Sequence, residues 1–525
     1  MSHGPYKMVE ALQERIRAAE TAFHQAYWDS QIDASPANDA RREQLEIELR
    51  SIKGDPTVYQ EVLHALDEDV HDPVLLRQLQ LLKLSLTGNQ MSDERRSEIV
   101  ALSSSVESDF ASYRPQRRDH ALSDNDIEDV LKRSDDEGER RDVWEASKEI
   151  GAIVADRVRE LARLRNAAAR DLGFADFYRM SLELQEMSEE WLFSTLDQLE
   201  SLTNDPYMRW KEALDRALRK RFGTADLYPW HYADPFFQSV PPDVTPDLDG
   251  LLADKDPVDL THKTFTDWGF DLQKVIESSD LYPRANKCQH AFCIDVDRSG
   301  SDVRILCNIV PGERWTEVML HESGHAAYDL SIGDELPYLL KRAAHTFVTE
   351  AIALMCGALS QDPEWLTSVA GCDPTRIGGI AAELAPARAA QSLIFARWGG
   401  VMAHFERELY SDPEADLDSI WWDLVERFQL VARPPGRNAP DWAAKIHVAV
   451  APVYYHNYIL GEVLAAQLRT TIEREAGGLI GRRAAGELLR ERVFASGALL
   501  RWDALVEAAT GRELAADDYA AAIAV

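Results

Sequence analysis

The stretch Val318-Met319-Leu320-His321-Glu322-Ser323-Gly324-His325-Ala326-Ala327-Tyr328 combines an apolar pattern of helical period with the motif His-Glu-x-x-His. Residues four apart lie on the same face of a helix, so His321 and His325 can bind one metal ion together. Glu322 then lies within reach of a water molecule at that metal. This arrangement is typical of zinc hydrolases in which the glutamate is the general base. The motif predicts one zinc ion per chain; the alternative is two histidines that only cap or pack.

A catalytic zinc usually has three protein ligands and one open position. The stretch 345–355 downstream is predicted to form a second apolar helix, and Glu350 is its single acid. A carboxylate is rarely buried unless it is paired or bound to a metal. Glu350 is therefore the predicted third ligand, with a helix-surface acid as the alternative. His345 is expected to have a structural or supporting role.

The bulk composition limits the compartment and the partners. A chain of 525 residues can form several average domains or one large enzyme with two lobes. Its net charge of −33 disfavours nucleic acid as a partner. The sequence has no apolar signal core near its start and no run of eighteen apolar residues, which predicts a cytoplasmic protein without a membrane segment. Five sparse cysteines agree with a reducing compartment.

Helical patterns dominate the chain and predict a mainly α fold. They are interrupted by an aromatic, proline-rich stretch at 227–257, which we expect to connect two lobes. The predicted division is an N-terminal helical lobe over 1–225 and a catalytic lobe over 226–525, as one unit with interleaved lobes. Acidic runs at 124–126 and 135–139 lack the spacing of a calcium loop and are expected to be helix caps and turns.

One small β-hairpin is predicted ahead of the zinc motif. Alternating apolar residues over 290–297 and 302–310 flank a turn that contains glycine. In this register Cys293 and Cys307 face each other, and we expect both to be reduced.

The stretch 321–325, followed by Thr349-Glu350-Ala351-Ile352, resembles the zinc peptidases with two histidines and a downstream glutamate. It is most similar to the angiotensin-converting-enzyme family and its relatives thimet oligopeptidase and oligopeptidase F. Lys445-Ile446-His447-Val448, the tyrosine-rich stretch 452–458 and Gln289-His290-Ala291 also resemble segments of that family. The resemblance implies a large two-lobed helical fold with a deep central channel and an N-terminal lid.

The resemblance also implies roles for individual residues. His321, His325 and Glu350 would bind zinc, and Glu322 would activate water. Tyr458 would stabilise the oxyanion, with His447 in support, as an oxyanion requires such donors. The remaining positions would hold the substrate: its backbone by His290 and Ala291, and its C-terminal carboxylate by Lys445 and Tyr455. Tyr454 is an alternative to Tyr455, since the chain has one extra residue before this cluster.

Two positions depart from the family pattern. Leu354 stands where an acid often orients the first zinc histidine, so the partner of His321 must come from elsewhere. Asn457 stands where an arginine would serve an activating chloride. The predicted function is hydrolysis of short peptides, with release of C-terminal dipeptides if Lys445 and Tyr455 bind a free carboxylate and endopeptidase action otherwise. The alternatives are a zinc hydrolase of a non-peptide amide and an inactive peptide-binding homologue; the oligomeric state is not predicted.

Overall fold

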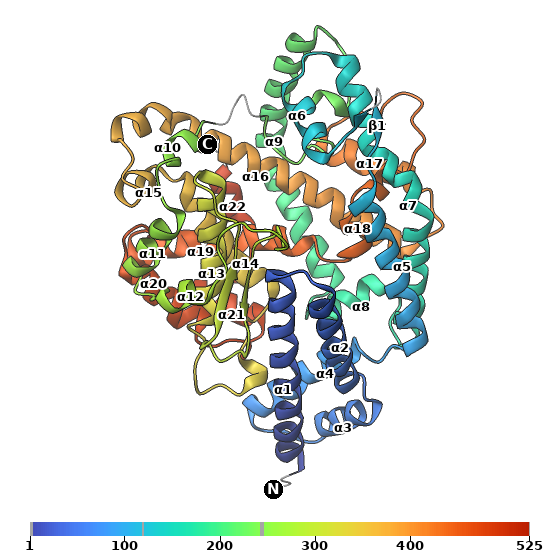
Figure 1. Cartoon of the computed structure of the whole chain (residues 1–525), viewed down its shortest axis with the longest axis vertical. Helices are drawn as coiled ribbons and strands as arrows, with labels where there is room; N and C mark the ends of the chain where they lie inside the picture. The colour runs from blue at the N-terminus through green and yellow to red at the C-terminus, as the bar shows by residue number, and fades with distance from the viewer. Residues whose placement is uncertain (1–3, 118–119, 242–245, 524–525) are drawn as a thin grey trace. The chain divides into compact units, whose positions relative to one another are not determined.

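The computed structural model describes residues 4–117, 120–241 and 246–523, most of which are helical (Figure 1). The strands in these ranges form two small two-stranded sheets. The predicted mainly α fold with a small hairpin is therefore confirmed. No helix in these ranges is both long enough and apolar enough to cross a membrane.

The chain divides into two compact units, and each is assembled from separate segments. Unit 1 consists of Met1–Gln90, Asp247–Ala381 and Leu460–Asp518. Unit 2 consists of Met91–Pro246, Ala382–Ile459 and Tyr519–Val525. The chain passes from unit 2 to unit 1 within the aromatic stretch that was expected to connect two lobes. The predicted boundary at residue 225 stays a prediction.

Unit 1 contains a helical N-terminal part and the stretch that carries the zinc motif. Its elements are α1 (Gly4–Ile32), α2 (Pro36–Lys53), α3 (Pro56–Asp67), α4 (Pro73–Thr87), α10 (Asp249–Leu252), α11 (Pro257–Asp267), α12 (Gln273–Ser278), β3 (Phe292–Asp295), β4 (Val303–Leu306), α13 (Glu313–Asp329), η3 (Tyr338–Leu340), α14 (Thr346–Gly357), η4 (Ala358–Gln361), α15 (Pro363–Ser368), α20 (Arg483–Leu489), η6 (Arg490–Phe494) and α21 (Trp502–Thr510). Helices α1 and α2 lie side by side (Figure 1).

Unit 2 is built around long helices. Its elements are α5 (Asp93–Ser112), β1 (Gln116–Arg117), β2 (His120–Ala121), α6 (Asp124–Arg133), α7 (Glu137–Asp171), α8 (Phe177–Leu184), α9 (Glu189–Phe222), η1 (Pro229–His231), α17 (Leu417–Gln429), η5 (Asp441–Ala444) and α18 (His447–Val450). Three helices contain residues of both units: α16 (Pro374–Ser411), α19 (His456–Ala476) and α22 (Asp517–Ile523).

Local sequence signals explain where many helices begin. A Ser or Asp side chain accepts a backbone N–H as N-cap, and the following proline occupies the first helical position, where no donor is needed. This pair begins α2, α3, α4, α11 and α15. The two acidic runs are helix caps, as predicted: Asp126 completes a capping box at α6, and Asp136 caps α7.

The hairpin forms, but its predicted register is wrong. Cys293 of β3 pairs with Ile305 of β4, and each strand has four residues. β3 ends early because the Asp295 carboxylate accepts the Gly300 N–H at 2.8 Å, so the chain turns sooner. The Cys307 N–H donates instead to the Asp280 carbonyl, at 3.0 Å. All five cysteines are free.

Candidate metal centre and substrate site

The zinc motif lies on α13, which packs closely against α14 in unit 1. Gly324 makes this approach possible. A Cβ at that position would lie 3.0 Å from the Ala353 Cα and 3.1 Å from the Cys356 Sγ. Any larger residue would push the two helices apart, and with them the histidines of α13 and the glutamate of α14.

The three predicted ligands come together in unit 1. Each of His321, His325 and Glu350 offers one ligand atom, and these atoms all lie within 4.8 Å of one another. The His321 Nε2 is 3.7 Å from a Glu350 carboxylate oxygen. The His325 Nδ1 is 2.7 Å from the Thr349 hydroxyl. When Nδ1–H donates to that hydroxyl, the lone pair of Nε2 points toward a metal.

The protonation of these side chains fits a divalent metal ion. Burial lowers the pKa of His321 to about 4, and burial together with His321 lowers the pKa of His325 to about 3. Both imidazoles are therefore neutral at neutral pH, as metal ligands must be. Burial also raises the pKa of the Glu350 carboxyl. A partly buried carboxyl beside two neutral imidazoles is the environment that a cation would stabilise.

Glu322 is buried beside this triad, with 8% of the residue exposed. Burial, Glu350 and Glu317 raise its pKa to about 8, although the backbone N–H of Cys293 in β3 opposes the shift. A cation held by the triad would favour the carboxylate form of Glu322. The hairpin thus lies directly against the predicted general base, which accounts for its place in the fold.

Leu354 of α14 stands at the position where an acid was expected from the family pattern. Its side chain packs on α19, where a Cβ at Gly461 would lie 3.2 Å from the Leu354 Cδ1 and 3.3 Å from the Glu350 Cβ. His345 has a structural role, as expected, because its Nδ1 accepts the Phe347 N–H at 3.2 Å and caps α14.

His290 and Ala291 lie in unit 1, directly before β3. His290 is exposed and Ala291 is partly buried. Their position at the open end of the hairpin leaves their backbone groups outside the β3–β4 ladder, which runs from Phe292 to Asp295.

The other predicted residues gather in unit 2. The Tyr455 ring centroid lies 5.4 Å from that of His447 and 5.5 Å from that of Tyr458. The Lys445 Nζ is 5.9 Å from the Tyr455 ring, so Tyr455 is the tyrosine beside this lysine. Tyr454 contacts Tyr458, with 5.3 Å between centroids.

Burial determines the protonation of Lys445, His447 and Tyr455. It lowers the pKa of Lys445 to about 8 and, with Lys445, that of His447 to about 4. His447 is therefore neutral at neutral pH, and its Nδ1 is buried without a hydrogen-bond partner in the described structure. Burial raises the pKa of Tyr455 to about 12; its hydroxyl accepts the Trp398 Nε1–H at 2.6 Å. The group therefore offers one cation and neutral donors, which suits an anionic ligand.

Gln238 was not predicted. The Lys445 Nζ donates to its Oε1 at 2.7 Å, so its amide lies directly beside the lysine. Gln238 follows two phenylalanines of the aromatic stretch, but nothing in the sequence pairs it with a lysine about 200 positions away.

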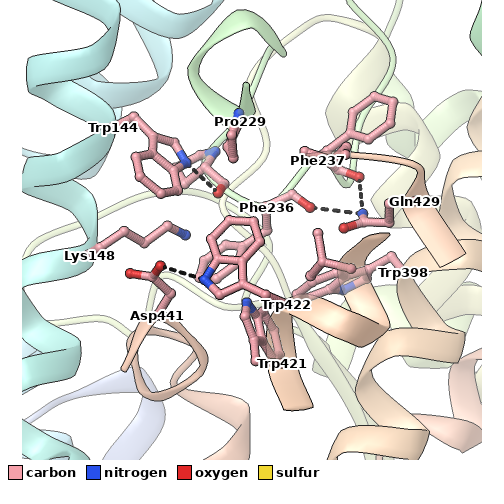
Figure 2. Close-up of a pocket in the computed structure, with 13 residues that line it drawn as sticks. Trp144, Lys148, Pro229, Phe236, Phe237, Trp398, Trp421, Trp422, Gln429 and Asp441 are labelled. Carbon is pink, nitrogen blue, oxygen red and sulfur yellow. Dashed lines mark hydrogen bonds between the residues drawn. The ribbon is translucent and has the colours of Figure 1, made fainter. Parts of the chain in front are cut away.

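Phe236, whose ring Lys445 also contacts, helps to line an aromatic cavity in unit 2. Figure 2 shows Lys148 from α7 among rings that include Trp144, Phe236 and Trp422. The cavity volume is about 20 Å³, enough for a single water molecule and too small for a peptide. This cavity is too small to be a substrate site, although its Trp398 also donates to the Tyr455 hydroxyl.

Comparison with known proteins gives two family matches on separate parts of the chain. Residues 277–525 match peptidase family M3, and residues 4–218 match the angiotensin-converting enzyme family. No curated protein matches the chain. The two families define the class: a metallopeptidase that acts on peptides. They confirm the predicted resemblance to the zinc metallopeptidases that include angiotensin-converting enzyme and thimet oligopeptidase.

Proposed function

We propose that this protein is a zinc-dependent peptidase that hydrolyses short oligopeptides. The observation that carries the proposal is the grouping of His321, His325 and Glu350 beside the buried Glu322. The two peptidase-family matches support it independently.

In this mechanism the side chains of the chain move one proton and hold the substrate. A zinc ion bound by the triad would supply a Lewis acid to the scissile carbonyl. A carboxylate oxygen of Glu322 accepts a proton from the attacking water. Glu322 then donates this proton to the leaving nitrogen. The Tyr458 hydroxyl donates to the developing oxyanion, and His447 supports the same charge.

We assign substrate binding to two sets of residues. His290 and Ala291 hold the substrate backbone. Lys445 and Tyr455 hold a C-terminal carboxylate, and the contact of Lys445 with Gln238 supports adding that amide to the set. This assignment favours release of C-terminal dipeptides. The five free cysteines support the proposed cytoplasmic location.

The substitution Glu322→Gln tests the mechanism. We expect the variant to retain one zinc per chain by elemental analysis and to lose peptide turnover by roughly 100-fold or more, since general acid–base catalysis contributes on that order. His321→Ala, by contrast, should lose both the metal and the activity. Turnover retained in Glu322→Gln would contradict the role of the general base.

A peptide panel distinguishes the substrate classes. We expect peptides with a free C-terminus to be cleaved faster than their amidated counterparts, and Lys445→Met to remove this difference. Equal cleavage of both by the unmodified protein would indicate an endopeptidase. Bound zinc without turnover of any peptide would favour a non-peptide amide as substrate, and absence of zinc would favour an inactive homologue.

A further inference from the structure

The segment that carries the unit 2 site residues contains a strained turn. Val453 has a φ of +54° and is buried, with 2% of the residue exposed. A β-branched residue in this left-handed region is a clear outlier, because its side chain crowds the backbone. Such strain persists only where the surroundings hold it, and it collects at functional sites.

Two side chains hold the backbone of Val453 from both sides. Its N–H donates to the Glu406 Oε1 of α16 at 2.7 Å. Its carbonyl accepts from the Gln185 Nε2, which follows α8, at 3.3 Å. Both polar groups of the strained residue are thus satisfied by side chains from distant parts of unit 2.

Gln185 also contacts the residues between the two tyrosines. Its Oε1 lies 3.1 Å from the Asn457 Nδ2, which donates to it, and 3.1 Å from the His456 Nε2. The Asn457 Nδ2 also donates to the Tyr454 carbonyl at 3.1 Å. One glutamine therefore connects the strained turn to the first turn of α19, where Tyr458 lies.

Glu406 is an unusual residue to bury for stability alone. Only 2% of it is exposed, and burial raises its pKa to about 8. Arg165 opposes this shift in pKa, and its guanidinium donates to the Ala449 carbonyl at 2.8 Å. An apolar side chain would fill the same volume without this desolvation cost, but it would leave the Val453 N–H without an acceptor.

We propose that Glu406 and Gln185 are positioning residues, which hold Val453 in its strained conformation and thereby fix Tyr455 and Tyr458 for catalysis. The inference rests on the proposed peptidase function, because it assigns a purpose to the tyrosine segment of that site. Neither residue touches the substrate; each acts through the backbone of 453–458.

The test compares Glu406→Leu with the double variant Glu406→Leu/Val453→Gly. Glycine adopts a positive φ without strain, so it does not need the carboxylate to hold it. We expect Glu406→Leu to lower kcat at least tenfold with little change in KM, and Val453→Gly to restore much of that loss. Glu408→Gln, on the same helix but with a side chain 41% exposed, is the matched control and should behave as wild type.

Hydrogen–deuterium exchange gives a readout that does not depend on turnover. We expect Glu406→Leu and Gln185→Ala to speed amide exchange across 449–458, while exchange in the α13 region stays unchanged. If the wild type cleaves no peptide but the exchange results hold, the proposed function fails and the holding role stands. Unchanged kcat or unchanged exchange in a folded, zinc-loaded Glu406→Leu protein would overturn the inference, as would a loss of kcat that Val453→Gly does not restore.

Discussion

Lys148 is a cation enclosed by aromatic rings. Its Nζ lies 3.2 Å from the centroid of the Phe236 ring, and 4% of the residue is exposed. Burial lowers the pKa of Lys148 from 10.5 to about 7, although the charge of Asp441 opposes this. The unfolded chain therefore binds this proton more tightly than the folded protein does. Stability should rise with pH between about 7 and 10.5 through this group.

Replacing the lysine by an apolar residue of similar length should stabilise the protein. We expect Lys148→Met to raise the melting temperature at pH 7, by the equivalent of about 2 kcal/mol, because the cost of burying the ammonium disappears. The advantage over wild type should shrink toward pH 10. The matched control Lys132→Met, at a partly exposed ion pair on α6, should change little. A lower melting temperature for Lys148→Met at pH 7 would mean that the cation–π contact outweighs burial.

Glu20 shows the opposite balance in unit 1. Its residue exposure is 3%, and its carboxylate lies 2.7 Å from Lys53, 3.1 Å from Arg298 and 2.8 Å from the Tyr338 hydroxyl. Burial alone would raise its pKa, but Arg298 and Lys53 outweigh burial and lower it to about 2. Burial lowers the pKa of Lys53 even though Glu20 lies beside it. The cluster therefore favours the charged form of Glu20 and not that of Lys53.

This cluster predicts acid sensitivity. Because the folded pKa lies below the ordinary 4.5, the stabilisation is complete above pH 4.5 and is lost as pH falls toward 2. We expect Glu20→Gln to lower stability at pH 7 by about 2 kcal/mol, since two partly buried cations lose a buried partner. The deficit should be smaller at pH 3 when thermal unfolding is measured at both values. Glu14→Gln, in an exposed pair with Arg17, is the control; an equal effect there would refute the argument from burial.

Among the elements, close helix packing is set by glycines. Gly486 of α20 faces the backbone of Trp268, and a Cβ at this position would lie 2.0 Å from the Trp268 carbonyl oxygen. We expect Gly486→Ala to destabilise the protein by about 3 kcal/mol, because a backbone atom cannot move aside as a side chain can. In contrast, Gly378→Ala in α16 meets no atom within 4 Å and should stabilise slightly, by about 0.5–1 kcal/mol. Thermal unfolding of both variants checks the contrast; similar melting temperatures would contradict it.

The sequence predicted the elements that carry local signals. The helical period of 318–328 and 345–355 predicted α13 and α14, and the four-residue spacing predicted that the two histidines share one face of α13. The hairpin was found from its alternating residues, but its register was not. That register depends on the Asp295 side chain and on the pairing of Cys307 with Asp280, and neither leaves a periodic pattern.

Contacts between distant segments could not be predicted. Gln238 reaches Lys445 and Gln185 reaches Val453 through hydrogen bonds across more than 200 positions. A lone glutamine carries no sequence signal for such a partner. Glu406 is similar: its burial makes it informative in the structure, whereas in the sequence it stands beside Arg407 and Glu408 and resembles an ordinary exposed charge.

For the whole molecule, metal binding and folding should be coupled. The triad joins α13 to α14, so an ion that binds only the folded protein stabilises it in proportion to its concentration over its Kd. We expect a zinc chelator to lower the melting temperature and abolish turnover, and added zinc to restore both. His321→Ala should have a melting temperature that no longer responds to either treatment. The opposite result is a chelator that abolishes the activity of the wild type and leaves its melting temperature unchanged. That result would show that the ion does not stabilise the packing of these helices.

Unit 1 is assembled from separate segments, so its first helices are synthesised long before the residues that they pack against. The apolar faces of α1, α3 and α4 pack together against Tyr338 and Leu339 of η3. A ribosome adding about 5–20 residues per second completes α4 roughly 250 residues, or on the order of 10–50 s, before that partner exists. During this interval the apolar faces of α1, α3 and α4 lack the η3 residues that they pack against. Preventing its aggregation is a task for chaperones that bind the emerging chain, and expression without enough of them should yield inclusion bodies even though the finished fold is well packed.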